Sequence, residues 1–124
     1  MPKTIKKVCF VDDEPLILDI YSLSFNQAGY QVFTADNGDD GIALIRKIRP
    51  DIAFVDLIMG KTSGFDVLKA IKQDKRYKSI PIIVLTNYDS EEARLQACRL
   101  GSLYYIIKPD YRPKELVSLA DEIL

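Results

Sequence analysis

Five polar residues that could act together closely follow the short apolar runs of this 124-residue chain. They are Asp12 and Asp13 after the first run, and Asp56, Thr86 and Lys108 after three later runs. Carboxylates that lie close together repel one another unless a positive group lies among them, and Mg2+ prefers oxygen ligands of this kind. Lys108 would add a compact positive charge and Thr86 a hydroxyl donor. If these residues meet, they predict chemistry on a phosphate group that is bound by a metal ion and a lysine.

Asp56 is the candidate nucleophile of this set. A carboxylate can attack phosphorus and form an aspartyl phosphate, and such a transfer mainly requires positioning and neutralisation of charge. Asp56 stands alone after its apolar run, whereas Asp12 and Asp13 can share the metal ion. One oxygen of Asp56 would therefore stay free to attack.

The elements that must position these residues are strands that alternate with helices. Runs rich in β-branched and aromatic residues predict strands at 8–11, 31–35, 52–55, 80–85 and 103–107. Apolar residues three or four positions apart predict a helix after each strand. Pro15 opens the first helix, which is marked by Leu16, Ile20 and Leu23. The later helices are marked by Ile42, Ile45 and Ile48, by Phe65, Leu68 and Ile71, by Ala93, Ala97 and Leu100, and by Leu116, Leu119, Ala120 and Ile123.

Five strand-helix units predict a single α/β domain over residues 1–124, with a parallel sheet and helices on both faces. Ligands of such sheets bind beyond the carboxyl ends of the strands, so the polar residues after the first, third, fourth and fifth strands would meet at one edge. Taken singly, each also fits a plain structural role, since acids favour helix N-termini and Thr suits a strand. Their joint placement at one edge of the sheet favours a functional site over five separate structural roles. Ser63 and Ser90 are expected to be helix caps rather than nucleophiles.

The composition excludes several classes of function. With 17 basic and 18 acidic residues the net charge is −1, which gives no electrostatic reason to bind nucleic acid or anionic lipid. The absence of His excludes Ser-His-Asp, Cys-His and His-containing zinc sites. No apolar stretch approaches a membrane span or a signal segment. Cys9 and Cys98 each lie in an apolar run, as buried reduced thiols do, and we therefore expect a cytoplasmic protein.

Five segments resemble the receiver domains of two-component response regulators. Residues 11–15 (VDDEP) are similar to the acidic pocket of that family, and residues 56–59 (DLIM) are similar to its phosphoacceptor segment. Residues 63–64 (SG) resemble the start of its third helix. Residues 85–86 (LT) resemble the segment with its switch hydroxyl, and residues 105–109 (YIIKP) resemble its lysine segment. The resemblance covers essentially the whole chain. It implies a flavodoxin-like, doubly wound (βα)5 fold with five parallel strands in the order 2-1-3-4-5.

The resemblance also implies how the acidic residues work. Asp56 would accept a phosphoryl group from a histidine kinase or a phosphotransfer protein. Mg2+ would be held by Asp13, Asp56 and the backbone carbonyl of Ile58, with Asp12 acting through water.

The implied output is a change of shape rather than turnover of a substrate. Thr86 and Lys108 would bind phosphoryl oxygens, Thr86 would be drawn towards the phosphate, and Tyr105 would turn inward. These movements would alter the face formed by the fourth helix, the fifth strand and the fifth helix, where a downstream protein or a second copy of the chain would bind. The chain would not be an enzyme beyond slow loss of its own phosphate. The resemblance further implies a cis bond between Lys108 and Pro109.

Several residues depart from the family pattern. Gly60 stands where a Pro is usual, which should loosen the loop after Asp56. Asn87 stands where a small residue is favoured and should narrow phosphoryl access, and Asp110 adds a negative charge beside the lysine segment. Ile58 and Tyr88 could flank the path of an attacking water, so we expect the acyl phosphate to be hydrolysed slowly.

Three other functions stay open on the sequence alone. A small phosphohydrolase would also form an aspartyl phosphate. Its nucleophile would follow the first strand, with an acid two residues after the nucleophile, and at that place this chain reads DDEP (12–15). A flavin carrier shares the fold, although three acids after the first strand would repel its phosphate. A degenerate receiver used as a constitutive binding module is the third. The sequence also leaves open the kinase, the target, and whether the chain acts alone or belongs to a longer regulator.

Overall fold

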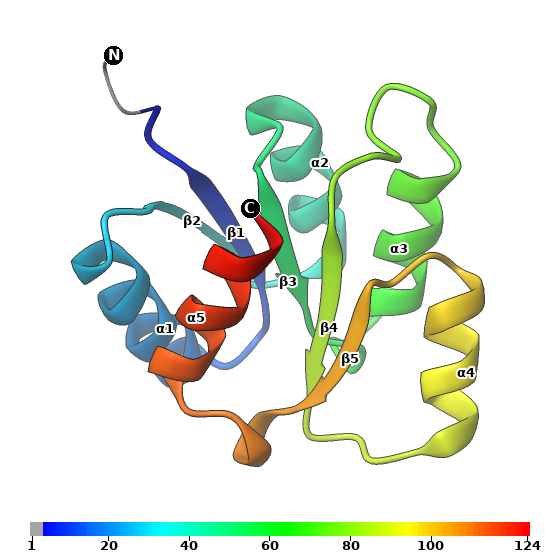
Figure 1. Ribbon diagram of the computed structural model, residues 1–124. Helices are drawn as coiled ribbons and strands as arrows, with labels where there is room; N and C mark the ends of the chain where they lie inside the picture. The colour runs from blue at the N-terminus through cyan, green and yellow to red at the C-terminus, as the bar shows by residue number, and fades with distance from the viewer. Residues whose placement is uncertain (1–3) are drawn as a thin grey trace.

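The computed structural model describes residues 4–124 and contains a parallel five-stranded sheet between two layers of helices (Figure 1). Its strands are β1 Lys7–Val11, β2 Gln31–Ala35, β3 Ile52–Val55, β4 Ile82–Thr86 and β5 Tyr104–Ile107. All neighbouring strands pair in parallel, in the order β2-β1-β3-β4-β5. The predicted fold class and strand order are confirmed. β4 begins two residues later than predicted, because the amide of Ile80 donates to the carbonyl of Tyr77 (3.0 Å) and so belongs to the preceding turn.

The helices divide unequally between the two faces of the sheet. On one face lie α1 Pro15–Gln27 and α5 Pro113–Ile123, and on the other lie α2 Gly38–Ile48, α3 Gly64–Lys72 and α4 Glu91–Arg99 (Figure 1). A short 3-10 turn, η1 Lys108–Asp110, joins β5 to α5. Along residues 4–124, none of the helices is both long and apolar enough to cross a membrane.

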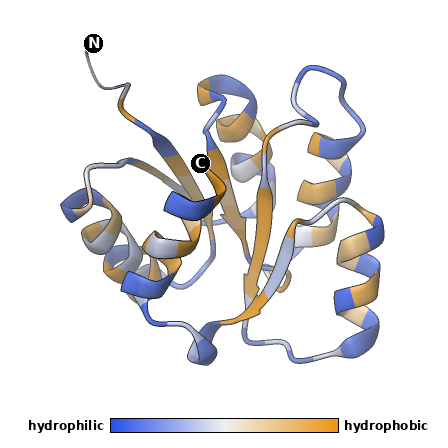
Figure 2. Ribbon diagram, viewed as in Figure 1, coloured by the Kyte–Doolittle hydropathy of each residue, from blue (hydrophilic) through white to orange (hydrophobic). Residues whose placement is uncertain are grey.

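The sheet separates two apolar cores because successive strand residues point to opposite faces. Phe10 and Phe54 pack with α1 and α5, whereas their neighbours Val11 and Val55 pack with α2, α3 and α4. Figure 2 shows the central strands apolar along their length and the helices hydrophilic on their outer surfaces. This is the pattern of a parallel sheet that is covered on both sides, and it leaves only the strand ends free for polar chemistry.

The buried face of α1 differs from the prediction. Leu16, Ile20 and Leu23, which mark the helix in the sequence, are 77%, 50% and 60% exposed. Leu18, Tyr21 and Phe25 are buried instead, with the rings of Tyr21 and Phe25 against Phe10 at centroid distances of 5.4 and 5.1 Å. Both sets have helical spacing, so periodicity alone could not choose between them. Contact with the aromatic face of the sheet decides which set is buried.

Two predictions about polar side chains have opposite outcomes. Ser63 and Ser90 are helix caps, as predicted: their hydroxyls accept from the amides of Asp66 and Ala93 at 3.4 and 3.2 Å. The prediction of two buried thiols is right for Cys9, where burial raises the pKa to about 12. It is wrong for Cys98, which is exposed on α4 because only Ala93 and Ala97 of that helix are buried.

Candidate functional site

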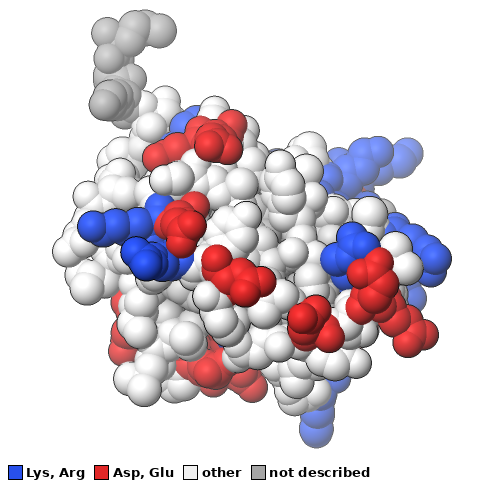
Figure 3. Space-filling view, turned by 60° about the horizontal axis from the view of Figure 1, so that its bottom comes forward, with Lys and Arg blue, Asp and Glu red and all other residues white. Residues whose placement is uncertain are grey.

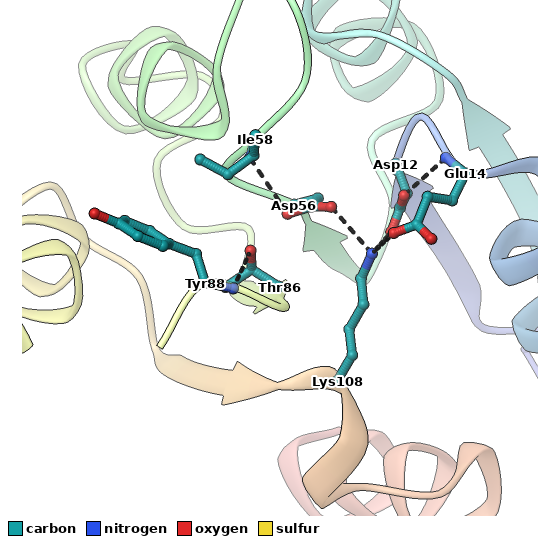
Figure 4. Close-up of polar contacts among 7 residues, drawn as sticks. All are labelled: Asp12, Glu14, Asp56, Ile58, Thr86, Tyr88 and Lys108. Carbon is teal, nitrogen blue, oxygen red and sulfur yellow. Dashed lines mark hydrogen bonds and ion pairs between the residues drawn. The ribbon is translucent and has the colours of Figure 1, made fainter. Parts of the chain in front are cut away.

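The polar residues predicted to meet do so at the carboxyl edge of the sheet. Figure 4 shows Asp12, Asp56, Thr86 and Lys108 of this set. Asp12 and Asp13 follow β1, and Asp56 follows β3, which pairs directly with β1. These three residues each offer a carboxylate oxygen within 4.8 Å of the other two. Asp12 and Asp56 are buried, whereas Asp13 is exposed. The acidic cluster therefore has two members in the protein interior and one that faces solvent.

Lys108 lies at the centre of the carboxylates. Its ammonium nitrogen is 2.6 Å from an oxygen of Asp12, 2.9 Å from one of Glu14 and 3.0 Å from one of Asp56. The side chains of Lys108, Asp12 and Asp56 are 4–6% exposed, while that of Glu14 is 48% exposed. An ammonium group has three N–H donors. All three donors of Lys108 are therefore used by carboxylates.

The backbone holds Asp12 and Asp56 in register with the sheet. The amide of Asp12 donates to the carbonyl of Ala35 at 3.0 Å, and the amide of Asp56 donates to the carbonyl of Val11 at 2.9 Å. Gly64, the first residue of α3, packs against the backbone of Asp56 so closely that a Cβ atom would lie 2.2 Å from the Asp56 carbonyl oxygen. Only glycine fits there, and the start of α3 therefore fixes the acid from the side.

Burial and ion pairing oppose each other in this cluster. Burial raises the pKa of Asp12 above its usual value, even though hydrogen bonds from Lys108 and from the Glu14 amide act to lower it. Burial acts to lower the pKa of Lys108, but hydrogen bonds to Asp12, Glu14 and Asp56 outweigh it and raise that pKa. Lys108 therefore stays charged, and it is the counter-charge that the buried Asp12 and Asp56 share.

Thr86 and Tyr105 both contact the backbone of Tyr88. The hydroxyl of Thr86, at the end of β4, accepts from the amide of Tyr88 at 3.2 Å. The hydroxyl of Tyr105, on β5, donates to the carbonyl of Tyr88. The loop after β4 is thus bound from both sides, by a buried Thr86 and a half-buried Tyr105.

A cavity of about 440 Å3 opens beside the acids. Its walls come from the loops after β1, β3 and β4, and are formed by Asp13, Glu14, Asp56, Ile58, Thr86, Asn87 and Tyr88. Figure 3 turns this edge towards the viewer, and both acidic and basic side chains appear on it. The cavity is the space where a group added to Asp56 would lie.

Comparison with known proteins decides the family. The sequence model of the response regulator receiver domain matches residues 8–121. The chain belongs to the response regulator receiver family. It is 32% identical to the protein PilH of Pseudomonas aeruginosa over 83% of this chain and 85% of PilH. Its fold superposes on the chemotaxis protein CheY4 of Vibrio cholerae with a TM-score of 0.89 and 31% identity, covering 98% of this chain and all of CheY4.

Longer regulators also match this receiver. The phosphate regulon regulatory protein PhoB of Pseudomonas aeruginosa is 33% identical over 96% of this chain, and the match spans 52% of PhoB. Receiver domains are signalling modules that interact with histidine kinases or phosphotransfer proteins and with downstream targets. They generally bind Mg2+ at an acidic pocket, and Asp12, Asp13 and Asp56 form such a group in this chain.

The acidic residues of this receiver fit a hard divalent cation. Mg2+ is commonly bound through one or two carboxylates together with water and phosphate oxygens, and three carboxylate oxygens gather here with a single lysine to balance them. The amide of Ile58 donates to Asp56 at 3.3 Å. The contribution of the Ile58 carbonyl to metal binding stays a prediction.

The predicted cis bond between Lys108 and Pro109 is wrong, since residues 4–124 contain no cis peptide bond. Lys108 and Pro109 open the η1 turn, which the amide of Tyr111 closes by donating to the carbonyl of Lys108 at 3.3 Å. The trans isomer, which is favoured for X-Pro bonds in general, already places the Lys108 side chain in the acidic cluster.

Nothing in the sequence predicts the contact between Glu14 and Lys108. Glu14 is simply one of three acids that follow the first strand. Its position next to Asp12 and Asp13 is a visible signal, but a residue before Pro15 is equally well placed to cap α1. The structure shows no capping bond from the Glu14 side chain.

A larger hollow of about 580 Å3 lies elsewhere, between α1 and α2 along the edge strand β2. Its lining includes Asp19, Asp40 and Lys47, and none of the residues that gather around Lys108. The site of this receiver is therefore marked by its chemistry and not by the size of its cavity.

Proposed function

We propose that this receiver signals through Mg2+-dependent phosphorylation of Asp56. The observation that carries the proposal is the place of Asp56, a buried member of the acidic cluster that also lines the cavity and has one oxygen 3.0 Å from Lys108. The positive charge of Lys108 could bind a phosphoryl oxygen once a carboxylate gives up its contact with the ammonium group. The whole of residues 1–124 would then serve as one receiver domain in the cytoplasm.

In the transfer, an Asp56 oxygen attacks phosphorus in line with the leaving group. A new O–P bond forms while the P–N bond to the donor's phosphohistidine breaks, and the electron pair of the broken bond stays on the imidazole. Asp13, Asp56 and the Ile58 carbonyl would hold Mg2+, with Asp12 acting through water, and Mg2+ would neutralise phosphoryl charge during the transfer. Lys108 and the hydroxyl of Thr86 would bind phosphoryl oxygens.

Thr86 and Tyr105 would transmit the change. If Thr86 turns its hydroxyl towards the phosphate, it loses the hydrogen bond that it accepts from the amide of Tyr88. The carbonyl of Tyr88 accepts a hydrogen bond from Tyr105, so both residues act on the same part of the loop. The loop before α4 would then shift relative to β5. A phosphate needs to favour the altered state by only a few kcal/mol to change its population substantially.

The altered face would be that of α4, β5 and α5. Leu95 of α4, Tyr104 of β5 and the neighbouring Leu103 are 42%, 48% and 50% exposed, so this face offers apolar area for a downstream protein or a second copy of the chain. A histidine kinase or a phosphotransfer protein would donate the phosphoryl group to Asp56.

Intact-mass measurement after incubation with acetyl phosphate and Mg2+ tests the proposal. We expect one phosphoryl adduct in the native chain and none in Asp56→Asn. A chain that takes up no phosphoryl group would be a constitutive receiver. Rapid release of inorganic phosphate without an accumulating adduct would support the phosphohydrolase alternative.

A further inference from the structure

We infer that Glu14 is a positioning residue that holds Lys108 in the unphosphorylated site and releases it when a phosphoryl group arrives. The inference rests on the proposed phosphorylation of Asp56. Its structural basis is the convergence of Asp12, Glu14 and Asp56 on one ammonium group (Figure 4).

The donor count of Lys108 requires an exchange of partners. The ammonium group has three N–H donors, and each has a carboxylate oxygen within 3.0 Å. A phosphoryl oxygen can therefore gain a hydrogen bond from Lys108 only if a carboxylate gives one up. The identity of that carboxylate decides how readily the lysine becomes free.

Glu14 is the carboxylate that can leave most easily. Asp12 is 5% exposed and would lose its hydrogen bond without gaining water, which is costly for a buried charge. Glu14 is 48% exposed, and its carboxylate can turn into solvent. The Glu14 amide is bound to Asp12 at 3.0 Å, so its backbone stays in place while its side chain moves.

Within residues 4–124, the side chain of Glu14 makes no hydrogen bond or ion pair other than the one to Lys108. Glu14 is the N-cap residue of α1, where acids commonly accept hydrogen bonds from the first turn, yet its side chain makes no such bond. It points instead to Lys108 and lines the cavity beside Asp56. Its negative charge therefore lies where an anionic phosphoryl donor must enter.

Two consequences follow for the rate of phosphorylation. Glu14 competes with the phosphoryl group for Lys108, and its charge repels the donor. Removing the side chain in Glu14→Ala should speed phosphorylation by acetyl phosphate roughly twofold to fivefold, the size expected for a half-exposed ion pair. Glu14→Gln, which keeps a hydrogen-bond acceptor without the charge, should fall between the native chain and Glu14→Ala.

The experiment measures the rate of adduct formation by intact mass at saturating Mg2+ and two ionic strengths. In this reaction an Asp56 oxygen bonds to phosphorus while the bond from phosphorus to the acetate oxygen breaks, and acetate leaves with the electron pair. The rate advantage of both Glu14 variants should shrink as KCl is raised, because salt screens a half-exposed charge. Asp110→Asn is the matched control, since it removes an exposed acid from the η1 turn beside Lys108.

A second readout uses the metal-free, unphosphorylated protein. The NMR resonances of the Lys108 side chain should shift in Glu14→Ala and stay unchanged in Asp110→Asn. Rates of the Glu14 variants that match the native rate, or a rate increase of equal size in Asp110→Asn, would overturn the inference while the proposed function stands. An adduct that persists in Asp56→Asn would instead overturn the proposed function.

Discussion

The interior of the sheet and its carboxyl edge are both buried, yet they are stabilised in opposite ways. Phe10 and Phe54 belong to a cluster of buried apolar and aromatic side chains, and their two rings stack at a centroid distance of 5.1 Å. Directly after the same strands, Asp12 and Asp56 are also buried but depend on Lys108 for neutralisation. Apolar burial stabilises a fold, whereas buried ion pairs contribute little net stability because desolvation offsets their attraction. The edge is therefore the region that binding of a cation or a phosphoryl group can alter.

The largest effect is expected in the interior. Phe25→Ala should lower the free energy of unfolding by about 3–5 kcal/mol, because it opens a cavity among Phe10, Tyr30 and Phe54. Leu23→Ala, on the exposed side of the same helix, should change it by less than about 0.5 kcal/mol. Urea denaturation of both variants, with and without Mg2+, measures the difference. If Mg2+ narrowed the difference in stability between Phe25→Ala and the native chain, the interior and the edge would not be independent.

At the edge, Lys108→Met should destabilise the protein by about 3 kcal/mol in the absence of Mg2+, since it leaves buried carboxylates without a counter-charge. Millimolar Mg2+ should recover part of this loss, because a cation that binds the folded state stabilises it by mass action and should bind more tightly where Lys108 no longer neutralises the carboxylates. Lys69→Met, at an exposed position on α3, is the control. Thermal melts with and without Mg2+ provide the measurement, and equal losses in both conditions would show that the edge behaves as ordinary core.

A smaller and opposite effect is expected for Asp12→Asn. Because the pKa of Asp12 is raised in the folded protein, the folded state binds more protons than the unfolded chain at pH values just above the usual Asp pKa. The free energy of unfolding therefore falls as the pH rises through that window. Asp12→Asn removes the buried charge and should stabilise the Mg2+-free protein at pH 7 by about 1 kcal/mol.

The stabilisation in Asp12→Asn should fade as the pH falls below about 4, the usual Asp pKa, because Asp12 then becomes protonated in both states. Denaturation curves from about pH 3 to pH 8 give this profile. Asp110→Asn, at an exposed position, should follow the native chain throughout. If the native protein had a higher free energy of unfolding than Asp12→Asn at pH 7, Asp12 would be retained for stability and not for chemistry.

Much of the difference between the two regions could be predicted from the sequence. Continuous apolar strands such as 52–55 have to be covered on both faces, and the residues that follow such strands have to meet at one edge. Asp12, Asp56 and Lys108 were found in this way. The order of the strands was not contained in any local pattern and came from resemblance to the receiver family.

What the sequence could not supply depends on contacts between distant residues. The stripe of Leu16, Ile20 and Leu23 has the same period as the buried stripe of α1, and only the rings of the sheet distinguish them. Glu14 and Lys108 are 94 positions apart, so nothing local showed that they pair. Cys98 was placed in the core because its apolar neighbours were visible and its outward direction on α4 was not.

The smallest effect concerns the outer wall of the cavity. Ile58 and Tyr88 are 59% and 48% exposed and line the cavity beside Asp56 from two loops, where they could shield an acyl phosphate from water. Tyr88→Ala should shorten the lifetime of the phosphoryl adduct about threefold, equivalent to about 0.6 kcal/mol. Ile58→Asn, which adds a polar group able to orient a water, should shorten it at least as much. Leu103→Ala removes an apolar side chain of similar exposure away from the cavity and is the control. Because the side chains of both wall residues are about half exposed, denaturation curves should change little while the decay of the adduct accelerates. Unchanged lifetimes in both variants would show that water reaches the acyl phosphate by another path.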